Sequence, residues 1–147
     1  MADNCIQLIP ADPEAVPEKD KADAALKLLK RFFPRADEVT AFTSCRPRFF
    51  HPGELLTGSD CPRCGKTSDD WWEGALAAAM TSGDIHITAP CCGAPISLND
   101  LDFDSPAGFA RFVLEASNPR SEGLGSEDIA DLEAILGLKL RQIHVQF

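Results

Sequence analysis

Four cysteines in the middle of the chain have the residue types and the spacing of a metal site. The first pair lies in Cys61-Pro62-Arg63-Cys64-Gly65, and the second pair lies in Pro90-Cys91-Cys92-Gly93. A Cys-X-X-Cys turn places both sulfurs on one side of a loop, and the following glycine lets backbone N–H groups approach the thiolates. Four soft thiolates in a tetrahedron select zinc or an iron centre. The sequence therefore predicts a structural Zn²⁺ site with the ligands Cys61, Cys64, Cys91 and Cys92.

The second cysteine pair departs from the usual pattern of a zinc ribbon. A regular ribbon would place a cysteine at position 89, where this chain has Ala89. Neighbouring side chains in a strand point to opposite faces, so Cys91 and Cys92 reach one ion only if the backbone turns between them. The proline and the glycine that flank the pair favour such a turn. The alternative is a site of three cysteines in which His86 or His51 supplies the fourth ligand.

A closed site of four thiolates has no open position for water or substrate, so the predicted site is structural rather than catalytic. A redox role for the first pair needs a thioredoxin-like context, in which the motif stands between a strand and the helix that it opens. The next predicted helix begins several residues after Cys64, which fits that context poorly. No partnered Ser/His/Asp pattern and no glycine-rich phosphate loop accompany the cysteines. The sequence thus predicts no catalytic residues, and a zinc- or thiol-dependent enzyme stays an alternative.

Hydrophobic periodicity outside the cysteine segment predicts four strands and two helices. The strands cover residues 5–9, 39–43, 109–116 and 142–147. One helix covers residues 20–33 and ends at Pro34, and Ser126 caps a second helix that Gly137 ends. The order strand, helix, strand, strand, helix, strand is that of the ferredoxin-like (βαββαβ) fold, an α+β arrangement with an antiparallel sheet and two helices on one face.

The cysteines lie in a long segment that interrupts this pattern. We predict one domain over residues 1–147, with a ferredoxin-like core of residues 1–50 and 105–147 and a zinc-ribbon-like insertion of residues 51–104. Residues 46–58 have the prolines and glycines of a loop, and Ser68 or Asp69 can cap a helix that runs to about Met80. A strand over residues 85–89 and a further strand and turn over residues 96–104 complete the insertion. A connection of this length needs its own structure, which a metal would supply.

Composition is that of an ordinary globular protein, with 44% hydrophobic and 25% charged residues among 147. The formal net charge of −9 repels phosphate backbones and disfavours a nucleic-acid partner. No stretch approaches the roughly 20 apolar residues that a membrane helix needs, and the N-terminus lacks the basic and apolar parts of a secretory signal. These features predict a cytoplasmic protein with reduced thiols and without a membrane partner.

Several residues outside the site have two interpretations each. Cys5 and Cys45 have no ligand spacing and are predicted to be structural thiols. The neighbouring Trp71 and Trp72 form a binding platform, or at least one of them covers the metal site or packs the insertion onto the sheet.

The chain resembles a family of bacterial zinc-ribbon-containing proteins for which no activity is established. The resemblance extends over nearly the whole chain and implies a bacterial, cytoplasmic protein. Its motifs are Cys61-Pro-Arg-Cys-Gly65, Trp71-Trp72, Pro90-Cys-Cys-Gly93, Ser97-Leu-Asn-Asp-Leu101, Pro106-Ala-Gly-Phe-Ala-Arg-Phe112 and Arg141-Gln-Ile143.

Two functional hypotheses compete with the alternative of a zinc- or thiol-dependent enzyme. The leading one is a non-catalytic binding or adaptor module whose partner is another protein or a second copy paired through an edge strand. The other is a nucleic-acid-binding zinc ribbon, which would need Phe42, Phe109 and Phe112 to be exposed on the open face of the sheet.

Overall fold

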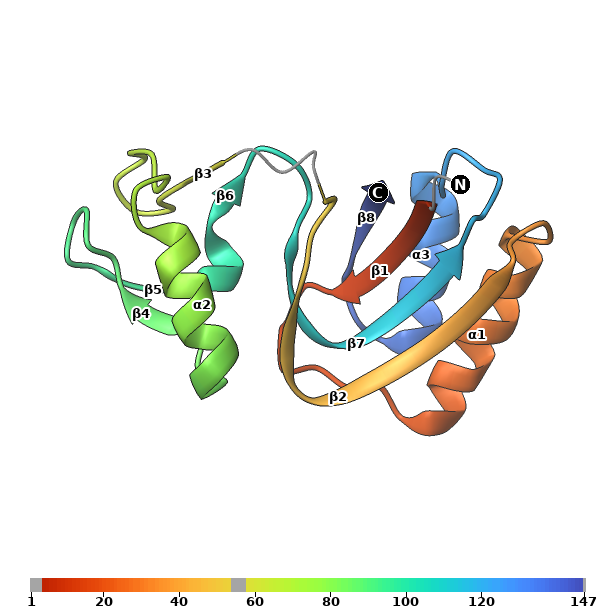
Figure 1. Cartoon of the computed structure of the whole chain (residues 1–147). Coiled ribbons are helices and arrows are strands. Elements are labelled where there is room, and N and C mark those ends of the chain that lie inside the picture. Colours follow the sequence, from red (N-terminus) through yellow and green to blue (C-terminus); the bar gives the residue numbers. More distant parts are fainter. Residues whose placement is uncertain (1–3, 54–57, 147) are drawn as a thin grey trace.

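The computed structural model describes residues 4–53 and 58–146 and shows an α+β protein with three α-helices (Figure 1). Within these ranges the elements form two sets, one from the two ends of the chain and one from its middle. The elements near the two ends are β1 (Asn4–Pro10), α1 (Lys19–Phe32), β2 (Glu38–Phe50), β7 (Gly108–Ser117), α3 (Ser126–Leu136) and β8 (Leu140–Gln146). Those in the middle are β3 (Ser59–Asp60), α2 (Trp72–Ser82), β4 (His86–Thr88), β5 (Pro95–Ser97), the short 3₁₀ helix η1 (Leu98–Asp100) and β6 (Asp102–Phe103).

The elements from the two ends of the chain form a four-stranded antiparallel sheet in the order β2-β7-β1-β8. Helices α1 and α3 pack together against one face of this sheet (Figure 1). Alternate apolar side chains of the two central strands meet the apolar stripes of the helices, because strand side chains alternate with a period of two. The buried contacts on this face include Ile6, Leu8, Leu29, Phe112, Leu114 and Leu132.

Strand β2 is longer than the sequence pattern predicts. We expected a loop from residue 46 to residue 58, but β2 continues through Pro47 to Phe50; residues 54–57 of that expected loop lie outside the described residues. The register with β7 shifts between Thr43 and Arg48, so Pro47 lies in a bulge. At this position the sheet needs no hydrogen bond from a backbone N–H, which proline lacks. Arg111 Nε donates to the Ser44 carbonyl at 3.0 Å and holds this bulge to β7.

The second face of the sheet is partly closed by the end of β2. Beyond Phe50 the chain reaches the far edge of the sheet, where Gly53 forms a parallel bridge with Gln146 of β8. Gly53 has φ +75°, and a Cβ there would stand 2.7 Å from the Gln146 carbonyl oxygen, so this close approach requires glycine. The apolar cluster on this side contains Ile9, Phe50, Ala110, Val113, Ile143 and Val145.

Two small hairpins and α2 form the middle of the chain. Strand β3 pairs with β6, and β4 pairs with β5. We expected Ser68 or Asp69 to cap α2, but the helix begins at Trp72 and has no side-chain cap. The Ser68 hydroxyl instead hydrogen-bonds the Ser59 hydroxyl in the interior, and an Asp69 carboxylate oxygen accepts the Ser59 N–H at 3.3 Å. These two side chains therefore tie the first cysteine loop to β3.

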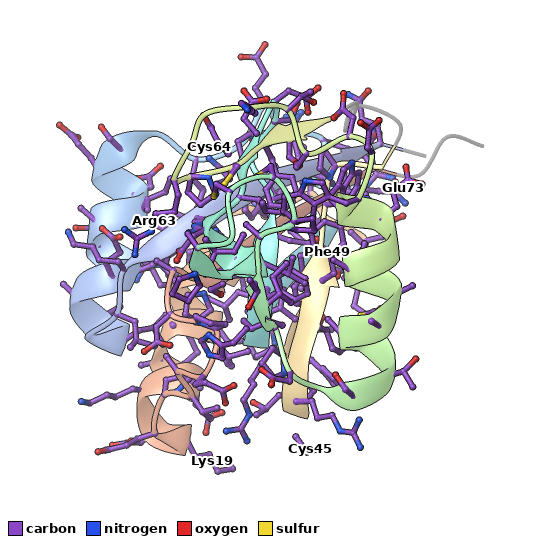
Figure 2. The ribbon with its side chains drawn as sticks, turned by 90° about the vertical axis from the view of Figure 1, so that its left-hand side faces the viewer. Lys19, Cys45, Phe49, Arg63, Cys64 and Glu73 are labelled. Atoms are coloured by element: carbon purple, nitrogen blue, oxygen red, sulfur yellow. The ribbon has the colours of Figure 1, made fainter. Side chains whose placement is uncertain are left out.

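Aromatic side chains join the middle segment to the sheet. The ring of Phe49 on β2 lies 5.0 Å from Phe109 of β7, 5.7 Å from Phe103 of β6 and 6.5 Å from Trp72 of α2. Figure 2 shows Phe49 at the centre of the side chains between β2 and α2. Of the two interpretations of the tryptophan pair, the packing contact holds for Trp72.

Two further expectations concern helices. Ser126 was expected to cap α3, but Gly125 is the cap residue and Ser126 is the first helical residue. The described helices include none that is long and apolar enough to cross a membrane.

Candidate metal centre

The four cysteine sulfurs lie close enough together to hold one metal ion. All four Sγ atoms are within 4.8 Å of one another. The Sγ atoms of Cys61 and Cys92 are 3.9 Å apart, and those of Cys64 and Cys91 are 3.4 Å apart. A tetrahedral zinc ion with Zn–S bonds of about 2.3 Å separates its sulfurs by about 3.8 Å. The sulfur spacing thus fits a four-coordinate ion such as zinc.

The first loop of the site is a tight turn built by its own backbone. The Cys61 N–H donates to the Lys66 carbonyl at 2.8 Å, and the Gly65 N–H donates back to the Cys61 carbonyl at 3.0 Å. Gly65 has φ +74°, a left-handed conformation that glycine adopts without strain. The Arg63 N–H points at Cys61 Sγ at 3.4 Å. The turn therefore holds the Cys61 sulfur in a fixed place with a backbone donor directed at it.

The second loop repeats this turn, but its cysteines occupy other positions. The Ala89 N–H donates to the Ala94 carbonyl at 2.8 Å, and the Gly93 N–H donates back to the Ala89 carbonyl at 2.7 Å. Gly93 has φ +73°. By this pattern Ala89 is the counterpart of Cys61, and Cys92 is the counterpart of Cys64.

The fourth thiol therefore comes from an unusual position in the turn. Cys91 takes the place that Arg63 has in the first loop, two residues beyond the position where a regular ribbon has its first cysteine. The turn between residues 89 and 93 brings both Cys91 and Cys92 into the cluster, as the sequence argument required. Ala89 itself is fully buried in the apolar cluster that also contains Cys61.

The four thiols differ in exposure and in acidity. Cys61 is buried and Cys91 is half-buried, whereas Cys64 and Cys92 are exposed. Backbone N–H groups of Cys64 and Arg63 lower the pKa of Cys61 to about 6. Burial, together with the neighbouring thiols, raises the pKa of Cys91 to about 12. Metals bind thiolates, so an ion that used Cys91 would displace its proton and bind more tightly as the pH rises.

Neither histidine that the sequence offered as an alternative ligand belongs to the sulfur cluster. His51 Nδ1 accepts the Gly53 N–H at 3.0 Å, and its ring stacks on Phe49 at 5.1 Å. His86 lies in β4 and lines an open groove beside Pro62 and Arg63. The geometry favours the four-cysteine set.

Trp71 is a neighbour of the cysteine cluster. The sequence predicted only that one of the two tryptophans would pack near the metal site or onto the sheet. Its side chain packs in the apolar cluster that contains Cys61 and Cys91, and it lines a shallow pocket with Lys66, Pro90 and Cys91. Its indole Nε1 is buried and has no hydrogen-bond partner among the described residues. Trp71 therefore packs beside the cysteine cluster, and both tryptophans are half-buried.

The remaining sequence candidates lie away from the cluster. Cys5 is in β1 and Cys45 is in β2, and Figure 2 shows Cys45 far from Cys64. Among the described residues, the cysteine cluster is the only group of three or more His, Cys, Asp and Glu side chains placed to share an ion.

Comparison with protein-family models, with curated proteins and with solved structures finds no match to this chain. The resemblance to a bacterial family therefore stays a prediction.

Proposed function

We propose that the protein binds one Zn²⁺ through Cys61, Cys64, Cys91 and Cys92, and that it is a non-catalytic binding or adaptor module. The observation that carries this proposal is the cluster of four sulfurs at tetrahedral spacing. Four thiolates satisfy a zinc ion completely, so the ion would hold the two cysteine loops together and have no position for a substrate.

The architecture supports a scaffold with an inserted metal-binding segment. The strand order β2-β7-β1-β8, with α1 and α3 on one face, matches the ferredoxin-like arrangement when the middle segment is left out. Residues 51–104 then form a zinc-ribbon-like insertion in the connection between β2 and β7. Its elements are short, and each hairpin has only two strands, so a bound metal would supply their rigidity.

The nucleic-acid hypothesis has less support than the binding-module hypothesis. It needs three exposed aromatic residues on the sheet, but Phe109 and Phe112 are each 1% exposed and only Phe42 is accessible. The net charge of −9 also opposes a phosphate backbone.

Metal analysis combined with a thiol titration tests the proposal. We expect purified protein to carry one zinc per chain, with the four cluster thiols protected from a thiol reagent until a strong chelator removes the ion. The exposed Cys45 should react without chelator and serves as the internal standard. A protein that takes up no zinc would refute the metal site. A fast-reacting cluster thiol in the zinc-bound protein would instead favour the thiol-enzyme alternative.

A further inference from the structure

The cysteine cluster contains two close sulfur contacts, and each of them joins one cysteine loop to the other. Cys64 Sγ lies 3.4 Å from Cys91 Sγ, and Cys61 Sγ lies 3.9 Å from Cys92 Sγ. A disulfide bond is about 2.05 Å long, so each pair is separated from a covalent bond by a movement of less than about 2 Å. The geometry that fits a metal ion therefore also places the thiols for oxidation in pairs.

The two contacts differ in how their sulfurs are exposed. Cys64 is exposed and Cys91 is half-buried, so an oxidant in solution can reach this pair. In the other pair Cys92 is exposed, but Cys61 is buried and the Arg63 N–H points at its sulfur at 3.4 Å. A hydrogen bond of this kind stabilises the thiolate and makes it a weaker nucleophile. Oxidation is therefore expected to begin at the contact between Cys64 and Cys91.

Disulfides within a single loop are less favourable than disulfides between the loops. Cys91 and Cys92 are neighbours in the chain, and a bond between them would close a small, strained ring. A bond between Cys61 and Cys64 would leave the second loop with only that strained pair. Oxidation of all four thiols without strain therefore requires two bonds between the loops, and the observed contacts pair Cys64 with Cys91 and Cys61 with Cys92.

Bonds between the loops would keep the middle segment together after the ion has left. Cys64 and Cys91 are 27 residues apart, and Cys61 and Cys92 are 31 residues apart. A cross-link that closes a long loop restrains the unfolded chain more than one that closes a short turn. Oxidation along the observed contacts would thus replace one link between the loops, the ion, by another.

We propose that the cysteine cluster is a redox switch that releases its zinc ion on oxidation by a hydroperoxide such as hydrogen peroxide, and that the first bond to form is a disulfide between Cys64 and Cys91. This inference rests on the proposed zinc site. The Cys64 thiolate attacks one peroxide oxygen and becomes a sulfenic acid, and the departing hydroxide takes up a proton to give water. The Cys91 thiolate then attacks the Cys64 sulfur, and the hydroxide that leaves takes up a second proton.

The reaction balances without any further reactant. Two thiolates, one hydrogen peroxide and two protons give one disulfide and two waters, so the thiolates lose the two electrons that the peroxide gains. The disulfide sulfurs are no longer thiolates. The site then has two of its four ligands, and the zinc affinity falls until the ion leaves.

Disulfide mapping of the zinc-loaded full chain after treatment with hydrogen peroxide tests the switch. Trypsin cleaves after Arg63 and Lys66 and so divides the cluster among three peptides, which are residues 49–63 with Cys61, residues 64–66 with Cys64, and residues 67–111 with the other two cysteines. Free thiols are alkylated first, and fragmentation of the linked peptides shows which of the neighbouring cysteines is bonded. We expect the first link to join Cys64 to Cys91, and one zinc per chain to reach a zinc-binding dye at the same rate.

Variants at saturating zinc separate the two sulfur contacts. Cys92→Ser keeps the contact between Cys64 and Cys91 and should form that disulfide within about twofold of the wild-type rate, whereas Cys64→Ser keeps only the contact of the buried Cys61 and should cross-link about tenfold more slowly. Each variant lacks one ligand, so the comparison is independent of weaker zinc binding. Cys45→Ser removes an exposed thiol outside the cluster and is the control with an unchanged rate.

Tryptophan fluorescence follows the fold of the middle segment during oxidation. The chain has two tryptophans, Trp71 and Trp72, and both lie in this segment. If the disulfides join the loops, the emission maximum of the oxidised, zinc-free protein should stay at its folded wavelength to a higher temperature than that of the reduced, zinc-free protein.

Four results would overturn the proposal. These are a first link between Cys61 and Cys64, zinc that stays bound after the disulfide has formed, equal rates for Cys64→Ser and Cys92→Ser, and an oxidised protein that melts like the reduced, zinc-free one. A protein that takes up no zinc before oxidation would instead refute the metal site itself. A failed switch and a failed zinc site therefore give different results.

Discussion

Replacing Cys91 by alanine lowers zinc affinity by on the order of 100-fold, and adding Ala89→Cys to that variant restores most of the lost affinity. Structural zinc sites bind with about 10–16 kcal/mol, so one of four ligands accounts for roughly a quarter of this energy, or about two to three decades in Kd. The rescue follows from the repeated turn, because Ala89 has the place in the second loop that Cys61 has in the first.

Competition with a chromophoric chelator measures these affinities, and cobalt substitution reports the number of thiolate ligands from the intensity of the metal bands. The matched control is Ala89→Ser with Cys91→Ala, which adds a side chain of similar size without a thiol and should stay weak. If Cys91→Ala binds zinc as tightly as the wild type, Cys91 is not a ligand. A double cysteine variant that stays weak would contradict the equivalence of the two turns.

Residue types alone were enough to identify the four candidate ligands, because few arrangements other than a metal site gather four thiols with glycine-ended turns. The sequence alone did not show that Ala89 occupies the place in the second turn that Cys61 has in the first. Whether two adjacent cysteines point to one ion depends on the backbone hydrogen bonds of residues 89–94, which no spacing rule contains. The same limit applied to His86, whose position in the groove beside Pro62 and Arg63 depends on contacts distant in the sequence.

The strand and helix pattern of the core followed from periodicity, whereas contacts distant in the sequence decided the places where the prediction was wrong. Pro47 suggested a loop, but it lies in a bulge of an edge strand, where a missing donor is tolerated. Ser68 and Asp69 suggested a helix cap, but their oxygens bond Ser59, nine and ten residues earlier. In each case a contact distant in the sequence replaced the local interaction that the rule assumes.

A buried amide makes a second connection that sequence reasoning missed. Asn99 of η1 is 4% exposed, and its Nδ2 donates to the Ala11 carbonyl at 2.9 Å. Its Oδ1 accepts the Phe109 N–H at 2.8 Å and also receives Arg141 Nη1 at 3.3 Å. The middle segment is thus hydrogen-bonded to the loop after β1, to β7 and to β8 through one side chain.

Asn99→Ala should destabilise the protein by about 3 kcal/mol, because it leaves the Phe109 N–H and the Ala11 carbonyl without their partners at about 1–3 kcal/mol each. Arg141 loses less, since its guanidinium still donates to the carbonyls of Ala107 at 3.1 Å and Asn99 at 3.3 Å. For a chain of this size the loss corresponds to a fall in Tm of about 10 °C, measured with saturating zinc so that the metal site contributes equally. Asp100→Ala, one residue further on and exposed, is the matched control and should change the stability by less than about 0.5 kcal/mol. Equal Tm values for the two variants would mean that Asn99 does not hold the middle segment to the sheet.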